Sequence, residues 1–302
     1  MFALFLAILA SAAISMTFKL AEMKPGHSRV GMVFVNEIMA LTFSLMLASS
    51  IPWFRVSWFT SFFSEMRQVF GSGGLFGVDA AYGYAVMIAL IGGVASYLGM
   101  YANQTSTARN GAAMTVTFNK SGVIIPIGLS MLVFREFPTA LQLFGVALAL
   151  AGIIMIYFKK EALSAITSRG YLLATLFFGG FCDFLCKLYE SFGSDNGEKI
   201  YLIYVYTLAA VIAAVIYFKK REKITKWDVF FGILGGILLN STQRYMLVAL
   251  RTVPGIIVFP VYSLTVIIII NIVNLLFFHE KLTKRQYFAM GLMVASILLL
   301  NL

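Results

Sequence analysis

Several charged side chains of this sequence lie inside long apolar stretches, where a lipid environment makes them costly. Lys120 follows Asn119 near the middle of the stretch 108–134. An ammonium group at mid-membrane costs at least about 2.5–3.5 kcal/mol, and its stem cannot reach water over roughly 18 Å. We therefore predict that Lys120 faces an internal cavity and binds a negative group there. The alternative is a buried ion pair between Lys120 and Glu37.

A second deep charge, Asp183, precedes Lys187 by one helical turn in the stretch 170–190. A carboxylate inside a membrane can bind and release a coupling proton, so we predict an ion-coupling role for Asp183 and Lys187. Because residues four apart share one face of a helix, a simple ion pair between the two is the alternative.

A polar cluster interrupts the stretch 228–249, which is otherwise apolar. Asn240, Gln243 and Arg244 are spaced to share one side of a helix. Polar side chains also hold membrane helices together, but Arg244 beside Lys120 would form a site able to bind a carboxylate or phosphate. The predicted substrate-binding residues are Lys120, Asn119, Glu37, Arg244, Asn240, Gln243 and Tyr101.

The residue patterns of intramembrane enzymes and metal sites are missing from the sequence. The two histidines, His27 and His279, lie in or beside predicted loops, and Asp183 is the one aspartate deep in an apolar stretch. Cys182 and Cys186 lack the spacing of zinc ligands and are expected to be packed thiols. We therefore predict no catalytic residue, no metal site and no cofactor.

The composition is that of a polytopic membrane protein. Of 302 residues, 60% are hydrophobic and 12% are charged, with a mean hydropathy of +0.89, whereas soluble domains carry about 25% charged residues. The net charge of +10 comes from basic loops that would contact lipid head groups, so nucleic acid is excluded as a partner. We predict an all-α fold of ten transmembrane helices, at 2–21, 30–52, 80–103, 108–134, 138–158, 170–190, 200–218, 228–249, 256–278 and 285–302.

Short motifs recur between the two halves of the chain. The residues of 18–22 (FKLAE) correspond to 186–190 (CKLYE), and Gly92-Gly93 correspond to Gly235-Gly236. One insertion near 53–79 accounts for the change of offset; it contains Trp53 and Trp58 and is typical of an interfacial amphipathic helix that ends at glycines. The predicted units are therefore 1–160 and 161–302, each with five helices. Because five is odd, the second unit must be inverted, as in many secondary transporters, which bind substrate near the midplane.

The end of each half has the same pattern of a span, a short acidic loop and a glycine-bearing last span. These segments are LVFREFPTALQLFGVALALAGIIMIY, with Glu136, and LLFFHEKLTKRQYFAMGLMVASILLL, with Glu280. On this pattern the chain resembles the EamA-type ten-helix permeases of the drug/metabolite transporter superfamily. The resemblance implies a multi-pass protein of the cell membrane that works by alternating access. It also implies termini inside, whereas the basic loops predict termini outside.

The excess of deep cations favours one class of substrate. We predict a transporter of a small polar metabolite, anionic or zwitterionic, that could be coupled to a proton or another ion. A flippase for a lipid-linked or phospholipid head group and a drug-efflux permease are the alternatives.

Overall fold

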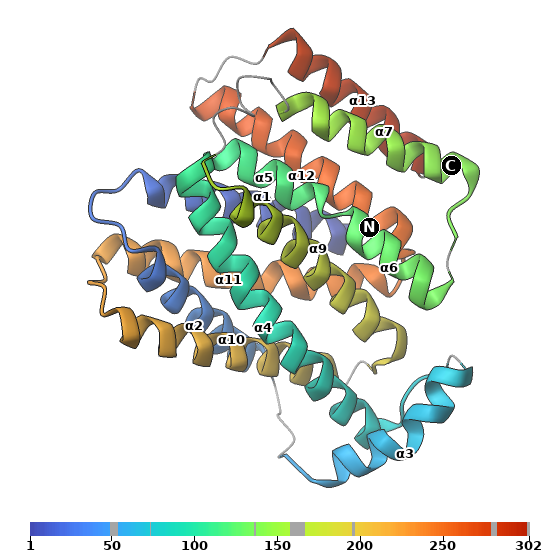
Figure 1. Cartoon of the computed structure of the whole chain (residues 1–302). Helices are drawn as coiled ribbons and strands as arrows, with labels where there is room; N and C mark the ends of the chain where they lie inside the picture. Colours follow the sequence, from blue (N-terminus) through green and yellow to red (C-terminus); the bar gives the residue numbers. More distant parts are fainter. Residues whose placement is uncertain are drawn as a thin grey trace.

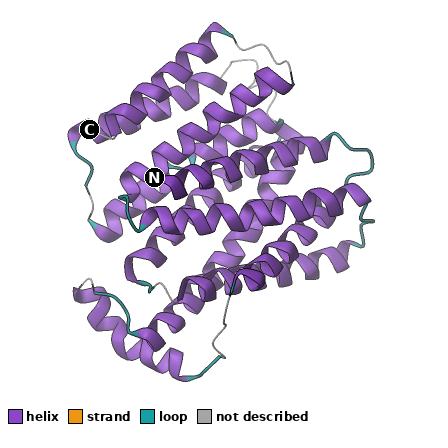
Figure 2. Ribbon diagram, turned by 180° about the vertical axis from the view of Figure 1, so that it is seen from behind, coloured by secondary structure: helices purple, strands orange, loops and turns teal. Residues whose placement is uncertain are grey.

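The computed structural model describes residues 1–48, 54–72, 74–135, 137–157, 167–194, 197–278 and 283–300. These residues form twelve helices and no strand (Figures 1 and 2). The all-helical prediction is therefore confirmed. The helices are α1 (Phe2–Glu22), α2 (Arg29–Leu47), α3 (Ser57–Ser72), α4 (Val78–Asn110), α5 (Ala112–Ser121), α6 (Ile124–Phe134), α7 (Ala140–Tyr157), α9 (Arg169–Phe192), α10 (Glu198–Lys220), α11 (Lys226–Leu250), α12 (Gly255–Phe277) and α13 (Lys284–Leu300).

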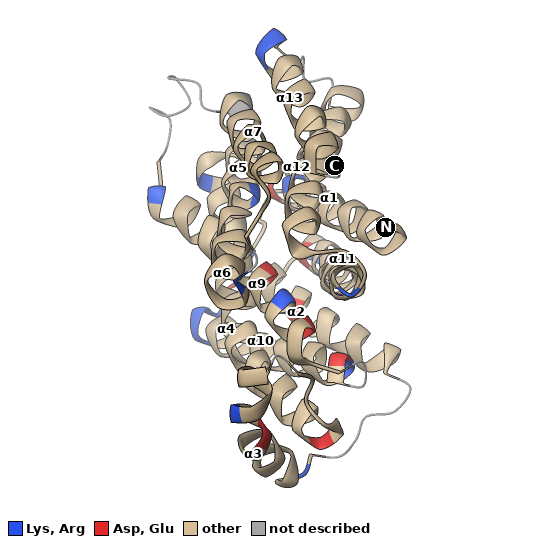
Figure 3. Ribbon diagram, turned by 90° about the vertical axis from the view of Figure 1, so that its right-hand side faces the viewer, with Lys and Arg blue, Asp and Glu red and all other residues tan. Residues whose placement is uncertain are grey.

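Seven segments of the described chain are long and apolar enough to cross a membrane. They are α1, α2, α4, α9, α10, α12 and the segment Met114–Phe134, which contains most of α5 and all of α6. In length and composition these are the helices of a membrane protein. Charged residues are sparse along the helices, as Figure 3 shows.

Three predicted spans differ from the helices. Helix α2 ends at Leu47, before the predicted end at residue 52. Helix α4 continues through Asn110, beyond the predicted end at residue 103, and stops at Gly111, whose φ of +83° is unfavourable for other residues. The predicted span 108–134 is not one helix, because α5 ends at Ser121 and α6 begins at Ile124. Trp53, Glu136, His279, Glu280 and the predicted unit boundary at 160–161 lie outside the described residues.

The insertion near 53–79 contains a helix, as predicted. Helix α3 buries Trp58 and Phe62 against the start of α4 (Figure 1). Gly83 permits this contact, because a Cβ at residue 83 would lie against the backbone carbonyl of Trp58. The amphipathic helix is therefore fastened to the bundle by its aromatic face.

The long helices pack in two groups. Helices α1 and α2 pack on α11, and helices α9 and α10 pack on α4. We call the first group body one and the second group body two. The two bodies meet where α2 contacts α10, and a further pair, α7 and α13, packs at one side of the bundle (Figure 1).

Two glycines determine how the α5–α6 segment meets α9. A Cβ at Gly180 would lie against the carbonyl of Gly122, and a Cβ at Gly122 would lie against the carbonyl of Leu176. The two backbones therefore touch directly, at the point where α5 gives way to α6. This contact holds the end of α5, which carries Asn119 and Lys120, beside the middle of α9.

Candidate functional site

A cavity of about 130 Å³ lies between body one, body two, α5 and α12. Since one water requires about 10–15 Å³ of such space, it has room for several waters or for a small metabolite. Its walls come from α1, α4, α5, α9, α11 and α12, and its polar lining includes Ser11, Asn119, Lys120, Asp183, Gln243 and Tyr262.

Lys120 lines the cavity, and its side chain is held from two directions. Its Nζ donates to Ser11 Oγ at 3.0 Å and lies 4.1 Å from the centroid of the Tyr262 ring. Both partners are neutral, so the lysine charge is oriented without being cancelled. The alternative of an ion pair with Glu37 was wrong, because neither carboxylate oxygen of Glu37 has a hydrogen-bond partner among the described residues.

Asp183 lines the same cavity from the middle of α9. It is close enough to Lys120 for the two charges to interact, yet the two side chains make no ion pair within the described chain. The cavity thus presents one cationic and one anionic group that do not neutralise each other directly. Such an arrangement can bind a molecule that carries both charges.

Lys187 is placed elsewhere. It borders a second hollow beside Glu190, Ser191 and Arg251, and its ammonium lies 5.4 Å from the centroid of the Phe134 ring. It therefore does not line the cavity that contains Asp183. Its ion-coupling role remains a prediction.

The remaining predicted residues divide between the cavity and helix contacts. Asn119 lines the cavity and donates to the Thr175 carbonyl at 3.4 Å, and Gln243 lines the cavity from α11. Asn240 instead joins α11 to α2, donating to the Ala40 carbonyl at 3.1 Å and to Ser44 Oγ. It therefore holds two helices together.

Arg244 and Tyr101 do not belong to the cavity lining either. Arg244 is half-buried on α11. Tyr101 accepts a hydrogen bond from Lys220 Nζ at 3.2 Å, and Lys220 is the last residue of α10. The prediction that Arg244 lies in the cavity beside Lys120 came from its spacing along one helix. Which polar residues of α11 reach the cavity depends instead on how α11 is rotated against α1 and α2.

Sequence reasoning missed the two residues that hold the lysine. Ser11 is a small polar residue in an apolar span, one helical turn before Ser15, which also lines the cavity. Tyr262 comes two residues after Pro260 within α12. The shared helix face of Ser11 and Ser15 is the signal that could have identified α1 as a cavity wall.

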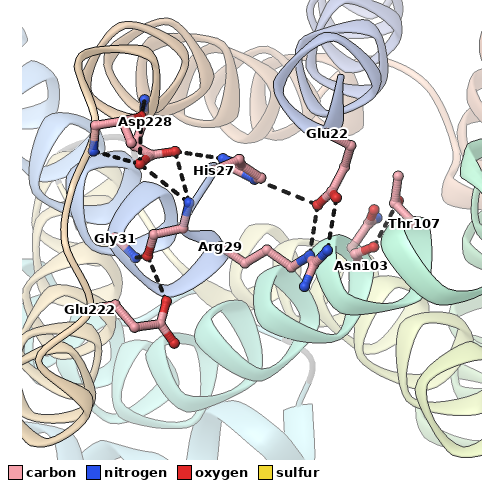
Figure 4. Close-up of polar contacts among 10 residues, drawn as sticks. Glu22, His27, Arg29, Gly31, Asn103, Thr107, Glu222 and Asp228 are labelled. Atoms are coloured by element: carbon pink, nitrogen blue, oxygen red, sulfur yellow. Dashed lines mark hydrogen bonds and ion pairs between the residues drawn. The ribbon is translucent and has the colours of Figure 1, made fainter. Parts of the chain in front are cut away.

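At one end of the bundle, a network of polar contacts ties the α1–α2 loop to the start of α11 (Figure 4). His27 Nδ1 lies 2.5 Å from Asp228 Oδ1, and His27 Nε2 lies 3.5 Å from Glu22 Oε1. Arg29 donates to both Glu22 oxygens, at 2.8 and 2.9 Å. Asp228 also caps α11 together with Thr225. His27 therefore links the α1–α2 loop to the start of α11, which is far away in the sequence.

His27 should make the stability of this network depend on pH. Burial lowers its pKa, but the hydrogen bonds and charges of Glu22 and Asp228 outweigh that effect, and the pKa lies above its ordinary value of 6.5. Because the folded protein binds this proton more tightly than the unfolded chain, protonated His27 adds to the free energy of unfolding. The contribution is fully present below about pH 6.5 and is lost as pH rises through the pKa of His27 in the folded protein. Charged hydrogen bonds of this kind contribute about 1.5–3 kcal/mol. We expect the melting temperature to fall from neutral to alkaline pH in the wild type and to fall less in His27→Gln.

The matched control for His27 is Arg29→Gln, which removes a network charge that does not titrate in this range. It should lower the melting temperature at every pH without flattening the profile. An unchanged pH profile in His27→Gln would contradict the role given to the histidine.

The His27 network lies beyond the end of α10, where Ser28 Oγ donates to Glu222 at 2.6 Å. A second polar cluster lies at the start of this helix, which is about 34 Å long at 1.5 Å per residue. Arg251 lies 3.2 Å from Glu190 and 2.5 Å from Glu198. Beside it the rings of Tyr84, Tyr189 and Tyr201 stack in sequence. Glu22 and Glu190 have the same position in the similar stretches FKLAE and CKLYE, and each lies in one of the two polar clusters.

The described residues offer no metal site, since no three His, Cys, Asp or Glu side chains among them are grouped to hold an ion. Cys182 borders the cavity, Cys186 is buried, and both are free thiols.

Comparison with known proteins supports the fold and no particular activity. No family model matches the chain, and no curated protein matches it. A solved structure described only as "Crystal structure of protein" is similar with a TM-score of 0.68 at 9% identity, over 99% of this chain and 96% of the other. At that identity the likeness extends to the fold alone.

Proposed function

We propose that this protein is a secondary transporter of a small zwitterionic metabolite of amino-acid size, working by alternating access. The observation that carries the proposal is the cavity with Lys120 and Asp183 on its walls, unpaired with each other within the described chain. A carboxylate of the substrate would lie against Lys120, and its ammonium group would lie against Asp183. An anion without an ammonium group would leave Asp183 uncompensated, which opposes its binding.

The contacts among the helices support two repeated halves. In chain order, α1, α2, α4 and α7 of the first half correspond to α9, α10, α11 and α13 of the second. The contact of α1 with α11 then corresponds to that of α9 with α4, and the contact of α2 with α11 corresponds to that of α10 with α4. The contacts between α2 and α10 and between α7 and α13 each join two equivalent helices. Exchange of the two halves thus preserves these contacts, as it would in a chain built from two repeated halves. The proposed inversion rests on the odd number of spans predicted for each half.

Uptake by purified protein in lipid vesicles tests this function. We expect uptake of labelled amino acids in preference to dicarboxylates and sugar phosphates. Ser15→Phe, which fills the cavity from α1, should abolish uptake and leave a monodisperse protein. Uptake that persists in Ser15→Phe would show that the cavity is not the path. Movement of labelled lipids between leaflets, with no uptake of soluble compounds, would favour a flippase.

A further inference from the structure

Glu37 is buried in a way that its neighbours do not explain. It lies in the middle of α2, its exposed fraction is 0%, and neither carboxylate oxygen has a hydrogen-bond partner within the described chain. An ionised carboxylate without partners costs several kcal/mol in such a place. The group therefore rests as the neutral carboxylic acid.

Glu37 lies at the seam between the two bodies. Its own helix, α2, belongs to body one and packs closely on α11, where a Cβ at Gly236 would lie against the carbonyl of Asn36.

The titratable groups near enough to interact with the Glu37 charge are Tyr97 on α4, Tyr206 on α10 and Cys182 on α9. All three belong to body two. On α11, Asn240 donates to the Ala40 carbonyl of α2, one turn along from Glu37, and its amide does not titrate.

A hydrogen bond crosses the same seam and reaches the cavity. Tyr206 on α10 donates to Gln243 Oε1 on α11 at 2.9 Å, and Gln243 lines the cavity. An ammonium group in the cavity that donates to Gln243 Oε1 would compete with Tyr206 for that oxygen. Competition of that kind loosens the seam where Glu37 lies.

We propose that Glu37 is a proton-binding site, which holds a proton while the seam is closed and releases it to water when the two bodies separate. A proton is the ligand that this position can take, because Glu37 does not line the cavity and is sealed from solvent. Release converts the carboxylic acid to a carboxylate and transfers the proton to water. As a means of coupling proton movement to the substrate, the inference rests on the proposed function.

The protonated state can be tested without any substrate. Infrared difference spectra of the purified protein in H₂O and D₂O should contain a carboxylic acid C=O band at neutral pH. The band should be lost in Glu37→Gln and retained in Glu65→Gln, which alters a carboxylate on α3 that accepts a hydrogen bond from the Gly77 amide at 2.8 Å. A band unaffected by Glu37→Gln would overturn the assignment.

The link to the seam has its own readout. Hydrogen exchange of the α2 peptide, corrected for the intrinsic effect of pH, should accelerate at alkaline pH in the wild type and stay constant in Glu37→Gln. Equal acceleration in both proteins would overturn the proposed link.

Coupling is tested by adding an equimolar mixture of labelled amino acids outside vesicles that contain the protein, under an imposed pH gradient. The wild type should concentrate amino acids, whereas Glu37→Gln should only equilibrate them. Concentration by Glu37→Gln, or indifference of wild-type uptake to the gradient, would overturn the coupling role. An absence of any wild-type uptake would instead contradict the proposed function, and the infrared result would still decide whether Glu37 holds the proton.

Discussion

Lys120→Met should weaken amino-acid binding by at least about 30-fold. The substitution keeps an unbranched side chain of nearly the same length and removes the charge that Ser11 and Tyr262 hold in the cavity. Loss of one member of a buried charge pair costs about 2–5 kcal/mol, and every 1.4 kcal/mol is a factor of about ten. Binding measured as ligand-induced thermal stabilisation of purified protein gives the comparison.

The change at Asp183 distinguishes zwitterionic from anionic substrates. Asp183→Asn should weaken binding of an amino acid by a similar factor, because its ammonium group loses a negative partner. The same variant should strengthen binding of a simple carboxylate, because it removes the repulsion between two anions. If Asp183→Asn leaves both affinities unchanged, Asp183 does not contact the substrate. Lys120→Arg, which keeps the positive charge, is the control for the lysine.

Gly180→Val should destabilise the protein by about 3 kcal/mol or more. Gly180 meets Gly122 backbone to backbone, and a side chain there would collide with the Gly122 carbonyl and with Ile125 Cβ at 3.0 Å. Overpacking a tight contact costs about 1–3 kcal/mol, and more where backbone must move. We expect a lower melting temperature and, in whatever protein remains folded, weaker ligand binding, since the α5–α9 contact positions Lys120.

Gly128→Ala is the matched control on α6, because a Cβ at residue 128 meets no atom within 4 Å. This substitution should leave stability unchanged or raise it slightly, since alanine favours the helix over glycine. Equal losses in Gly180→Val and Gly128→Ala would mean that the close approach of the two helices is not the cause.

The sequence determined the class of protein and its most important charge. Long apolar stretches have one stable solution in lipid, the helix, which satisfies every backbone polar group internally. The cost of a deep lysine likewise required a cavity, and Lys120 does line one. Both predictions depend on local composition, which a single stretch of chain contains.

The tertiary structure decided which deep polar residues belong together. Along α11 the sequence grouped Asn240, Gln243 and Arg244 on one side, yet of these three only Gln243 lines the described cavity, because α2 covers Asn240. Glu37 was predicted to bind substrate together with Lys120, or alternatively to pair with it, but it does not line the cavity and lies at the seam between the two helix bodies. Partners across helices depend on how each helix is rotated against its neighbours. Close contacts such as that of Gly122 with Gly180 fix this rotation, and the spacing within one helix does not reveal it.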